Sequence, residues 1–247
     1  GAEVVIPQSL LDLLGPDIKR FIPHDLHVSQ TELVQPREGV HSEAICGRTD
    51  DRIVSANPRV GRVMPVGCTS WLIDGGNLLS AGHCINQNFQ TVEFNVPASL
   101  ADGTTQAPSI RDQYRVRAGS IVSQNGGTGN DWAVFQVLSN TETGLMPANA
   151  QGAAFEISNT DNPTQVRITG YGLDGPAPDF GDGDRNAQSQ TQQTHSGRLA
   201  QNTADGVLRY DPDTQRGNSG SPVAVEDRNV AIGIHTDGGC GPNGGSN

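Results

Sequence analysis

The chain has 247 residues, of which 27 are acidic and 16 are Lys or Arg, so its formal net charge is −11. This acidic balance argues against nucleic acid or an anionic membrane as the main partner, because phosphate groups would be repelled. The 31 glycines and 15 prolines would interrupt helices, which argues against a helical bundle. The length suits one large domain or two small ones, and no apolar run is long enough to cross a membrane.

Residues 1–44 differ from the rest of the chain, and we interpret them as an N-terminal extension or prosegment. The run from Ser9 to Leu14 predicts one short helix, which Ser9 would cap and a Gly-Pro pair would end. Prolines cut the remaining residues into short pieces. Three histidines of this region are expected at the surface: His24, His27 and His41.

From about residue 45 the pattern changes to short β-rich runs bounded by Gly, Asn, Asp and Pro, which is typical of strands separated by turns. Many short strands with glycine-rich turns predict a sandwich or barrels. The predicted strands cover residues 63–66, 69–73, 91–96, 114–118, 132–138, 165–169, 207–210, 223–225 and 230–234.

The segment 172–186 is rich in Gly, Pro and Asp and predicts a loop. Its carboxylates could bind calcium together, because hard cations prefer several oxygen ligands. Their spacing differs from that of an EF-hand, and charge clusters usually face water, so a solvated acidic loop is the favoured interpretation. The four residues are Asp174, Asp179, Asp182 and Asp184.

The four cysteines contain no CxxC pair, so neither a zinc site nor a thioredoxin-like motif is expected. Their even number fits two disulfides with three possible pairings, and four buried free thiols are the alternative. Disulfides would require an oxidising compartment, so we expect a secreted protein, extracellular or periplasmic. The chain begins without a charged, apolar-cored leader, so any signal peptide would already have been removed.

Three motifs bring together the residue types that acyl transfer requires. His83 follows a Ser-Ala-Gly run, Asp131 opens an apolar run, and Ser219 lies in the turn Gly-Asn-Ser-Gly-Ser-Pro. An imidazole that titrates near neutral pH can take the proton of a serine hydroxyl and return it to the leaving group. A carboxylate on the other ring nitrogen fixes the tautomer, and small residues beside the serine leave backbone N–H groups for an oxyanion. The order His, Asp, Ser differs from the orders in subtilisins and α/β-hydrolases.

These motifs resemble those of the chymotrypsin-fold serine proteases. Residues 80–84 look like the histidine motif of that family, and residues 217–222 look like the nucleophile motif of its bacterial glutamyl endopeptidase branch. Residues 168–172 and 232–235 are also similar to that branch. The resemblance covers residues 45–247 and leaves the N-terminal extension unexplained.

The resemblance implies an all-β fold of two antiparallel six-stranded β-barrels with the active site between them. The protease domain would cover residues 45–247, with barrel one at about 53–145 and barrel two at about 146–247. It would follow the extension of residues 1–44.

The resemblance also implies the roles of the motif residues in a serine endopeptidase. His83, Asp131 and Ser219 would form the catalytic triad, and the backbone N–H groups of Gly217 and Ser219 would form the oxyanion hole. Neither a cofactor nor a metal ion is expected. A degenerate protease kept as a non-catalytic interaction domain is the alternative from another functional class.

A Cys68–Cys84 disulfide is implied by the resemblance, since the two cysteines have the spacing of the family's histidine-loop disulfide. Cys46 and Cys240 would then remain for a second bridge. That bridge would tie the start of the catalytic region to the wall of the substrate pocket.

The substrate preference is predicted from the glutamyl endopeptidase branch, in which a threonine and a histidine contact the substrate carboxylate. Thr214 lies five residues before Ser219, and His235 follows an Ile-Gly-Ile run. A hydroxyl and an imidazole can both donate to a buried carboxylate. Arg216 would add positive charge at the pocket rim, whereas Asp213 is interpreted as a loop acid. We therefore expect cleavage of protein or peptide substrates after Glu, or after Asp.

Alternatives stay open for the pocket. His235 could be a satisfied core histidine, and the enzyme could prefer small or apolar residues. His195 is expected on a strand of barrel two, where it could line the cleft. We expect a monomer with no nucleic acid or membrane partner.

Two features depart from the family pattern. Arg52-Ile53-Val54 looks like a trypsin-type activation site and suggests a zymogen, but the residue before the nucleophile is Asn218, which cannot form an ion pair with a new amine. We therefore expect maturation near residues 43–53 without trypsin-style activation. The chain also stops seven residues past Cys240, which we interpret as a truncation, an autolysis point or the end of one of two pieces.

Overall fold

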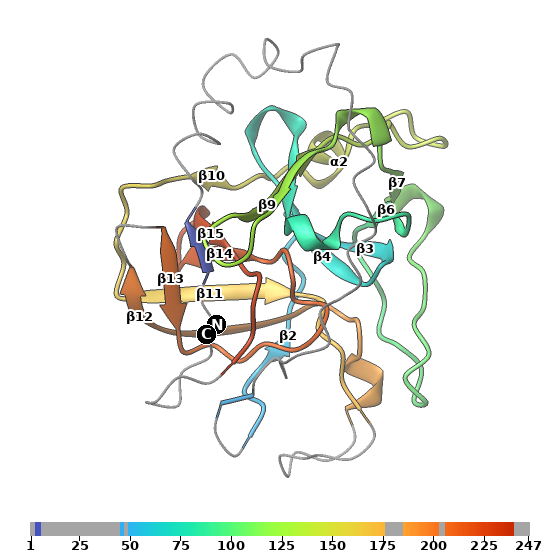
Figure 1. Cartoon of the computed structure of the whole chain (residues 1–247). Helices are drawn as coiled ribbons and strands as arrows, with labels where there is room; N and C mark the ends of the chain where they lie inside the picture. The colour runs from blue at the N-terminus through green and yellow to red at the C-terminus, as the bar shows by residue number, and fades with distance from the viewer. Residues whose placement is uncertain (1–2, 6–44, 47–48, 176–184, 203–205, 240–247) are drawn as a thin grey trace.

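The computed structural model describes residues 3–5, 45–46, 49–175, 185–202 and 206–239. These residues form two β-sheets connected by loops, and the one α-helix among them is the short α2 at Pro147–Gln151 (Figure 1). No helix in this part of the chain is both long and apolar enough to cross a membrane. The predicted all-β class is confirmed.

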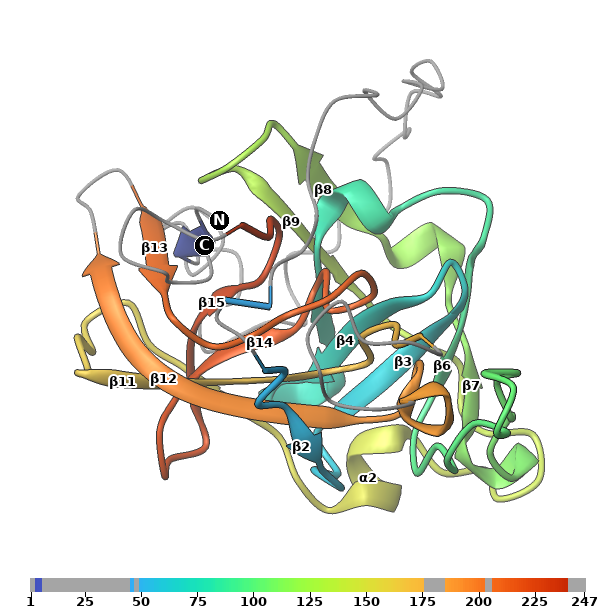
Figure 2. The ribbon, with the colours of Figure 1, turned by 90° about the horizontal axis from the view of Figure 1, so that it is seen from below.

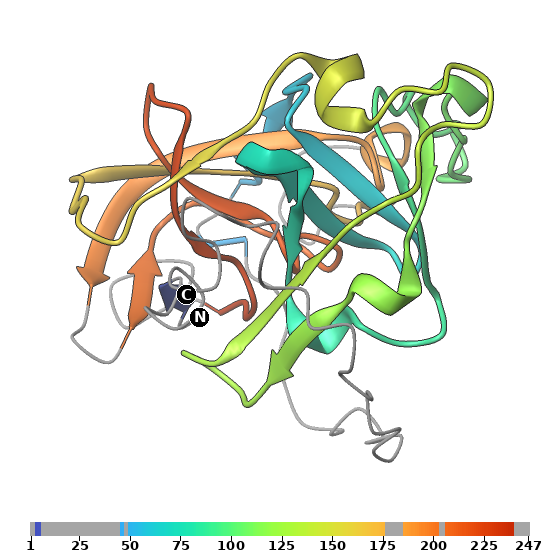
Figure 3. The ribbon, with the colours of Figure 1, turned by 90° about the horizontal axis from the view of Figure 1, so that it is seen from above.

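The N-terminal sheet contains seven antiparallel strands in the order β7-β6-β3-β4-β5-β9-β8. A bridge between Val116 and Val137 joins the segment after β7 to the segment after β9, so six strands curve into a ring. β8 extends β9 as a hairpin (Figure 3). The strands are β3 (Val60–Pro65), β4 (Cys68–Leu72), β5 (Leu78–Ser80), β6 (Phe89–Glu93), β7 (Gln113–Arg115), β8 (Val122–Asn125) and β9 (Asp131–Phe135).

The C-terminal sheet contains eight strands, six of which form a closed ring in the order β1-β13-β12-β11-β14-β15. β1 closes the ring because Val4 lies opposite Val207 of β13 and also opposite Ile234 of β15, antiparallel to both. β2 pairs with β12 (Figure 2), and β10 pairs with β15 in parallel. The strands are β1 (Glu3–Val5), β2 (Ile53–Val54), β10 (Glu156–Ile157), β11 (Gln165–Gly170), β12 (Gln193–Asn202), β13 (Val207–Tyr210), β14 (Pro222–Val225) and β15 (Val230–Ile234).

The two rings match the predicted pair of six-stranded antiparallel barrels, which lie side by side (Figure 3). One strand of the C-terminal ring, β1, comes from the region predicted to be an extension. Residues 6–44 lie outside the described residues, as do the predicted helix and the histidines of that region.

Apolar side chains fill both barrels. All five residues of β4 are buried, and Thr69 of this strand bonds to Gly217 and Tyr171 of the C-terminal half. Trp71 on β4 packs edge-on against Phe155, with ring centroids 5.6 Å apart. The same core cluster includes Tyr171 and Ile234 of the C-terminal half. Burial of this continuous apolar surface favours a fixed placement of one barrel against the other.

All nine predicted runs overlap strands, but the longest strand, β12, was not among them. Its ten residues are mostly polar and lack the apolar alternation that marks a strand. β12 is a strand because β11 and β13 pair with it on both sides. His195 lies on β12, as expected.

The segment predicted to be a solvated acidic loop differs from that expectation at its start. The side chain of Asp174 is only 3% exposed and pairs with two arginines. The other three acidic residues of the segment lie outside the described residues. The prediction of a solvated carboxylate is therefore wrong for Asp174. Arg52, which is distant in the sequence, and Arg185 stabilise the buried carboxylate.

Candidate active site

Strand pairing brings His83 and Asp131 together. His83 lies in the 3-10 turn at Gly82–Cys84, directly after β5, and Asp131 is the first residue of β9. Since β5 and β9 are antiparallel neighbours, the end of one meets the start of the other. A Cβ at Gly82 would lie only 1.7 Å from the Gln124 carbonyl oxygen, so only glycine fits before His83.

The carboxylate of Asp131 orients His83 through two contacts. Its Oδ2 lies 2.6 Å from His83 Nδ1, and its Oδ1 accepts the His83 backbone N–H at 2.8 Å. The Asp131 side chain is 6% exposed, whereas that of His83 is 35% exposed. A carboxylate beside Nδ1 favours the tautomer protonated there and leaves Nε2 as a proton acceptor.

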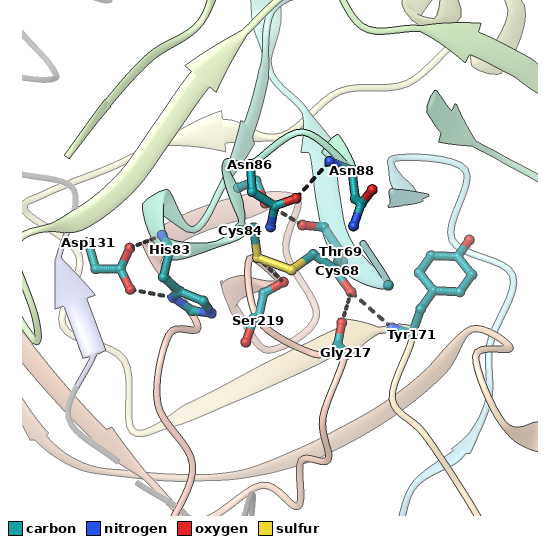
Figure 4. Close-up of a disulfide and its surroundings, with 12 residues drawn as sticks. Cys68, Thr69, His83, Cys84, Asn86, Asn88, Asp131, Tyr171, Gly217 and Ser219 are labelled. Atoms are coloured by element: carbon teal, nitrogen blue, oxygen red, sulfur yellow. Dashed lines mark hydrogen bonds and ion pairs between the residues drawn. A yellow bond between two sulfur atoms is a disulfide. The ribbon is translucent and has the colours of Figure 1, made fainter. Parts of the chain in front are cut away.

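Ser219 is held beside His83 by contacts to the N-terminal barrel. Its carbonyl oxygen accepts the Thr69 backbone N–H at 2.9 Å and lies 3.9 Å from Cys84 Sγ. The predicted Cys68–Cys84 disulfide is present, and it joins β4 to the turn that carries His83. Figure 4 shows the Ser219 side chain on the same side of this disulfide as the His83 ring.

The turn around Ser219 requires glycine before it. Gly217 has a φ of 97°, and a Cβ there would lie 2.3 Å from both the Tyr171 carbonyl oxygen and Gln190 Nε2. The Gly217 carbonyl accepts the Thr69 hydroxyl at 2.7 Å (Figure 4). Among the described residues, the backbone N–H groups of Gly217 and Ser219 have no hydrogen-bond acceptor. Two unpaired donors beside a serine suit an oxyanion.

Two residues predicted for the pocket, Thr214 and His235, are buried, at 0% and 1% exposure. His235 Nδ1 lies 2.6 Å from the Tyr210 hydroxyl, and the His235 carbonyl accepts the N–H of Gly220, directly after Ser219. Burial is the main cause that lowers the pKa of His235 to about 3, so the ring is neutral at neutral pH. Arg216, the third predicted residue, is exposed.

Asp213, interpreted as a loop acid, lies in the loop between β13 and β14, and it is only 2% exposed. Its Oδ1 accepts the N–H of Cys46 and its Oδ2 accepts the N–H of Asp51, both at 2.9 Å. Its own N–H donates to His195 Nδ1 at 2.9 Å, which accounts for His195 without a contact to Ser219. Burial raises the pKa of Asp213.

Asp213, His195 and Asp51 are the one group in the described part of the chain with metal-ligating atoms within 4.8 Å of one another. Both carboxylate oxygens of Asp213 already accept backbone N–H bonds. Hydrogen bonds within the protein therefore explain why these side chains lie close together. Cys46, which precedes it, is disulfide-bonded, while its expected partner Cys240 lies outside the described residues.

The sequence did not indicate a buried ion cluster that includes Arg52. Arg52 pairs with Asp50 and Asp174, and Arg185 lies beside both carboxylates. These four residues belong to three separate chain segments, so no local spacing marks them.

Comparisons with known proteins agree with this architecture. A Glu endopeptidase structure matches with a TM-score of 0.57 and 22% identity, covering 82% of this chain and 93% of that one. A thermostable serine protease from an extremophilic microorganism matches with a TM-score of 0.53 and 15% identity, covering 74% and 86%. The structure of HBP matches with a TM-score of 0.53 and 13% identity, covering 76% and 85%. No curated protein matches the chain.

The sequence itself matches the family model described as Trypsin over residues 53–246, which is most of the chain. This match agrees with the two barrels and with the resemblance of the motifs. The chain therefore belongs to the trypsin family and is a serine endopeptidase of the hydrolase class.

Proposed function

We propose that His83, Asp131 and Ser219 are the catalytic triad of this endopeptidase. The observation that carries the proposal is the two-point contact between Asp131 and His83, which fixes the ring beside Ser219. His83 Nε2 takes the proton of the Ser219 hydroxyl as its oxygen attacks the scissile carbonyl carbon. Asp131 stabilises the imidazolium that forms.

The second half of the reaction returns that proton. His83 gives it to the leaving amine as the C–N bond breaks, and an acyl ester on Ser219 remains. A water molecule, deprotonated by the same nitrogen, then hydrolyses the ester and restores the serine. The N–H groups of Gly217 and Ser219 stabilise the oxyanion in both halves, and their lack of an internal acceptor supports this role.

We further propose that Glu, or Asp, is preferred before the scissile bond. Thr214 and His235 would donate to the substrate carboxylate, and Arg216 would add positive charge at the pocket rim. The contact between the Tyr210 hydroxyl and His235 Nδ1 supports this assignment, since it fixes the orientation of the imidazole ring. The Glu endopeptidase among the similar structures gives further support.

A small or apolar preference is the competing specificity. The 1% exposure of His235 is the observation that favours it. Under this alternative His235 is a satisfied core histidine, and the triad chemistry is unchanged.

We propose secretion into an oxidising compartment, which the disulfide-bonded cysteines support. We also propose that residues 1–44 are an extension of a protease domain spanning residues 45–247. In the structure β1, which belongs to residues 1–44, pairs with β13 and β15 of the C-terminal barrel.

The test of catalysis is labelling with a fluorophosphonate probe, with Ser219→Ala as the control. Labelling of the wild type alone is expected, whereas an unlabelled, folded wild type would favour the non-catalytic interaction domain.

The test of specificity is a peptide panel that varies only the residue before the scissile bond. Cleavage after Glu that His235→Ala abolishes is expected. Equal cleavage after Ala or Phe would keep the protease and reject the carboxylate pocket.

A further inference from the structure

Arg52 is at the centre of a buried ion cluster. Its side chain is 2% exposed, and Nη2 lies 2.6 Å from Asp50 Oδ2 and 2.6 Å from Asp174 Oδ1. Its Nε donates to Asp50 Oδ1 at 2.9 Å. Removing the guanidinium would leave two buried carboxylates with one fewer compensating charge, so we expect loss of Arg52 to destabilise the fold.

A second layer of contacts completes the cluster. Arg185 Nε lies 3.3 Å from Asp50 Oδ2 and 3.2 Å from Asp174 Oδ1. Gln193 Nε2 donates to Asp174 Oδ2 at 2.6 Å. Burial alone would raise the pKa of Asp50, but hydrogen bonds and charge from Arg52 bring it below its ordinary value. The cluster is therefore built around an ionised Asp50.

The cluster touches the turn that carries the nucleophile. Asp174 follows Leu173, whose N–H donates to the Arg216 carbonyl at 2.6 Å. A Cβ on Gly172 would lie 2.2 Å from Arg52 Nη1 and 2.9 Å from Asn218 Nδ2. The guanidinium of Arg52 and the side chain of Asn218, the residue before Ser219, therefore both lie against Gly172 where a Cβ would project.

Asp213 provides a second attachment for the segment that carries Arg52. Its carboxylate accepts the N–H groups of Cys46 and Asp51, and it lies only six residues before Ser219. The described residues between 45 and 52 are thus attached to the C-terminal barrel at two points, Asp174 and Asp213.

Arg52 is at the same time the residue before the bond expected in a trypsin-type activation site. Ile53 and Val54 are 66% and 63% exposed, and they already pair with β12. A protease that cleaves after arginine must accept the guanidinium in its own pocket. The two carboxylates hold that group inside this protein instead.

We propose that Arg52 is a positioning residue that orders the 172–174 and 215–218 segments while the Arg52–Ile53 bond is intact, so that the N–H groups of Gly217 and Ser219 face the reacting carbonyl. The proposal rests on the proposed triad and oxyanion hole. It assigns to Arg52 a role in catalysis through the backbone of Gly172 and Leu173, without contact to the substrate.

The first test compares Arg52→Gln and Arg52→Lys with Arg167→Gln. Arg167 pairs with Glu226 in the same barrel, away from the Ser219 turn, and serves as the control for loss of an ion pair. We expect kcat of Arg52→Gln to fall by at least about tenfold, since a misplaced oxyanion donor acts on the transition state. KM should change much less, and Arg52→Lys, which keeps the charge, should recover part of kcat.

Thermal unfolding separates this role from a purely structural one. When both variants are assayed well below their melting temperatures, a kcat loss in Arg52→Gln alone supports the proposal, although Arg52→Gln, which removes the more buried guanidinium, should melt at a lower temperature than Arg167→Gln. Wild-type kcat in a folded Arg52→Gln would overturn it. Should Arg52→Gln not fold, Arg52→Lys and Asp174→Asn decide by the same split between kcat and KM, and two unaffected kcat values would reject the proposal.

The second test is the mass of the fluorophosphonate-labelled protein, analysed without reduction and after reduction. Labelled chains are expected to retain the Arg52–Ile53 bond. Label found only in chains cut at that bond would overturn the intact-bond proposal. Absence of label from every wild-type species would instead reject the proposed catalytic function, so the two failures are distinguishable.

Discussion

The two barrels hold their parts of the site by different forces. The N-terminal barrel places His83 and Asp131 through the pairing of β5 with β9 and through an apolar core that includes Trp71 and Leu79. The C-terminal barrel places Ser219 on a turn surrounded by ion pairs and hydrogen bonds from segments distant in sequence.

This difference shows that one site can combine strand pairing and apolar packing in one half with ion pairs and hydrogen bonds in the other. Strand pairing and apolar burial depend little on pH, and they suit the histidine and carboxylate that must stay oriented. Buried ion pairs depend on every partner being present, since loss of one leaves the others uncompensated. The turn around Ser219 therefore depends on residues elsewhere in the chain.

The largest expected effect tests the N-terminal half. Asp131→Asn should lower kcat by about 10⁴-fold, because the amide favours the wrong histidine tautomer while the packing is kept. Steady-state kinetics and circular dichroism check activity and fold separately. Asp227→Asn, in an exposed turn, is the matched control and should behave like the wild type. A loss below tenfold for Asp131→Asn would contradict the assigned role.

The second effect tests the C-terminal half. Gly217→Ala should lower kcat by about 10²- to 10³-fold, because a Cβ would collide with the Tyr171 carbonyl and displace one oxyanion donor. Gly119→Ala is the control, since nothing lies within 4 Å of a Cβ at that position. The kinetics of both variants are compared with the wild type. An equal loss of kcat in both variants would contradict the role of the Gly217 N–H as an oxyanion donor.

The third effect separates packing from catalysis. Leu79 is completely buried on β5, so Leu79→Ala should reduce the free energy of unfolding by about 2–5 kcal/mol. Leu138→Ala, at a side chain that is 47% exposed, should change it by less than about 0.5 kcal/mol. Urea unfolding in a Ser219→Ala background avoids autolysis. Similar values for the two variants would mean that the N-terminal barrel does not rely on its apolar core.

The smallest effect concerns pH. The pKa of His235 is lowered to about 3 from an ordinary value of 6.5, so the unfolded chain binds a proton in this range that the folded chain does not. The free energy of unfolding should therefore fall by about 1.4 kcal/mol per pH unit from this group as pH drops below 6.5. The loss should be weaker in His235→Gln. Urea unfolding at pH 7 and pH 5 measures this loss of unfolding free energy in both proteins. An equal loss in the wild type and in His235→Gln would mean that His235 has an ordinary pKa in the folded protein.

Most strands and the motif residues of the site could be predicted from the sequence. The apolar run after Asp131 and the glycine-rich turn around Ser219 are local patterns, since strand alternation and positive φ values restrict which residue types fit. A strand was expected at His195, but the ten-residue extent of the polar strand β12 escaped prediction, because its two neighbours, rather than its own residues, make it a strand.

The sequence by itself determined the all-β class and the residue types for acyl transfer, because each depends on composition or on neighbouring residues, whereas the Cys68–Cys84 disulfide was implied by the family resemblance and confirmed by the structure. Only the tertiary structure decided that Arg52 pairs with Asp174, that Asp213 is buried against the segment after Cys46, and that β1 closes the second barrel. These contacts join residues far apart in the chain. Whether a charge meets a partner or water depends on the three-dimensional packing of segments, which no local pattern specifies.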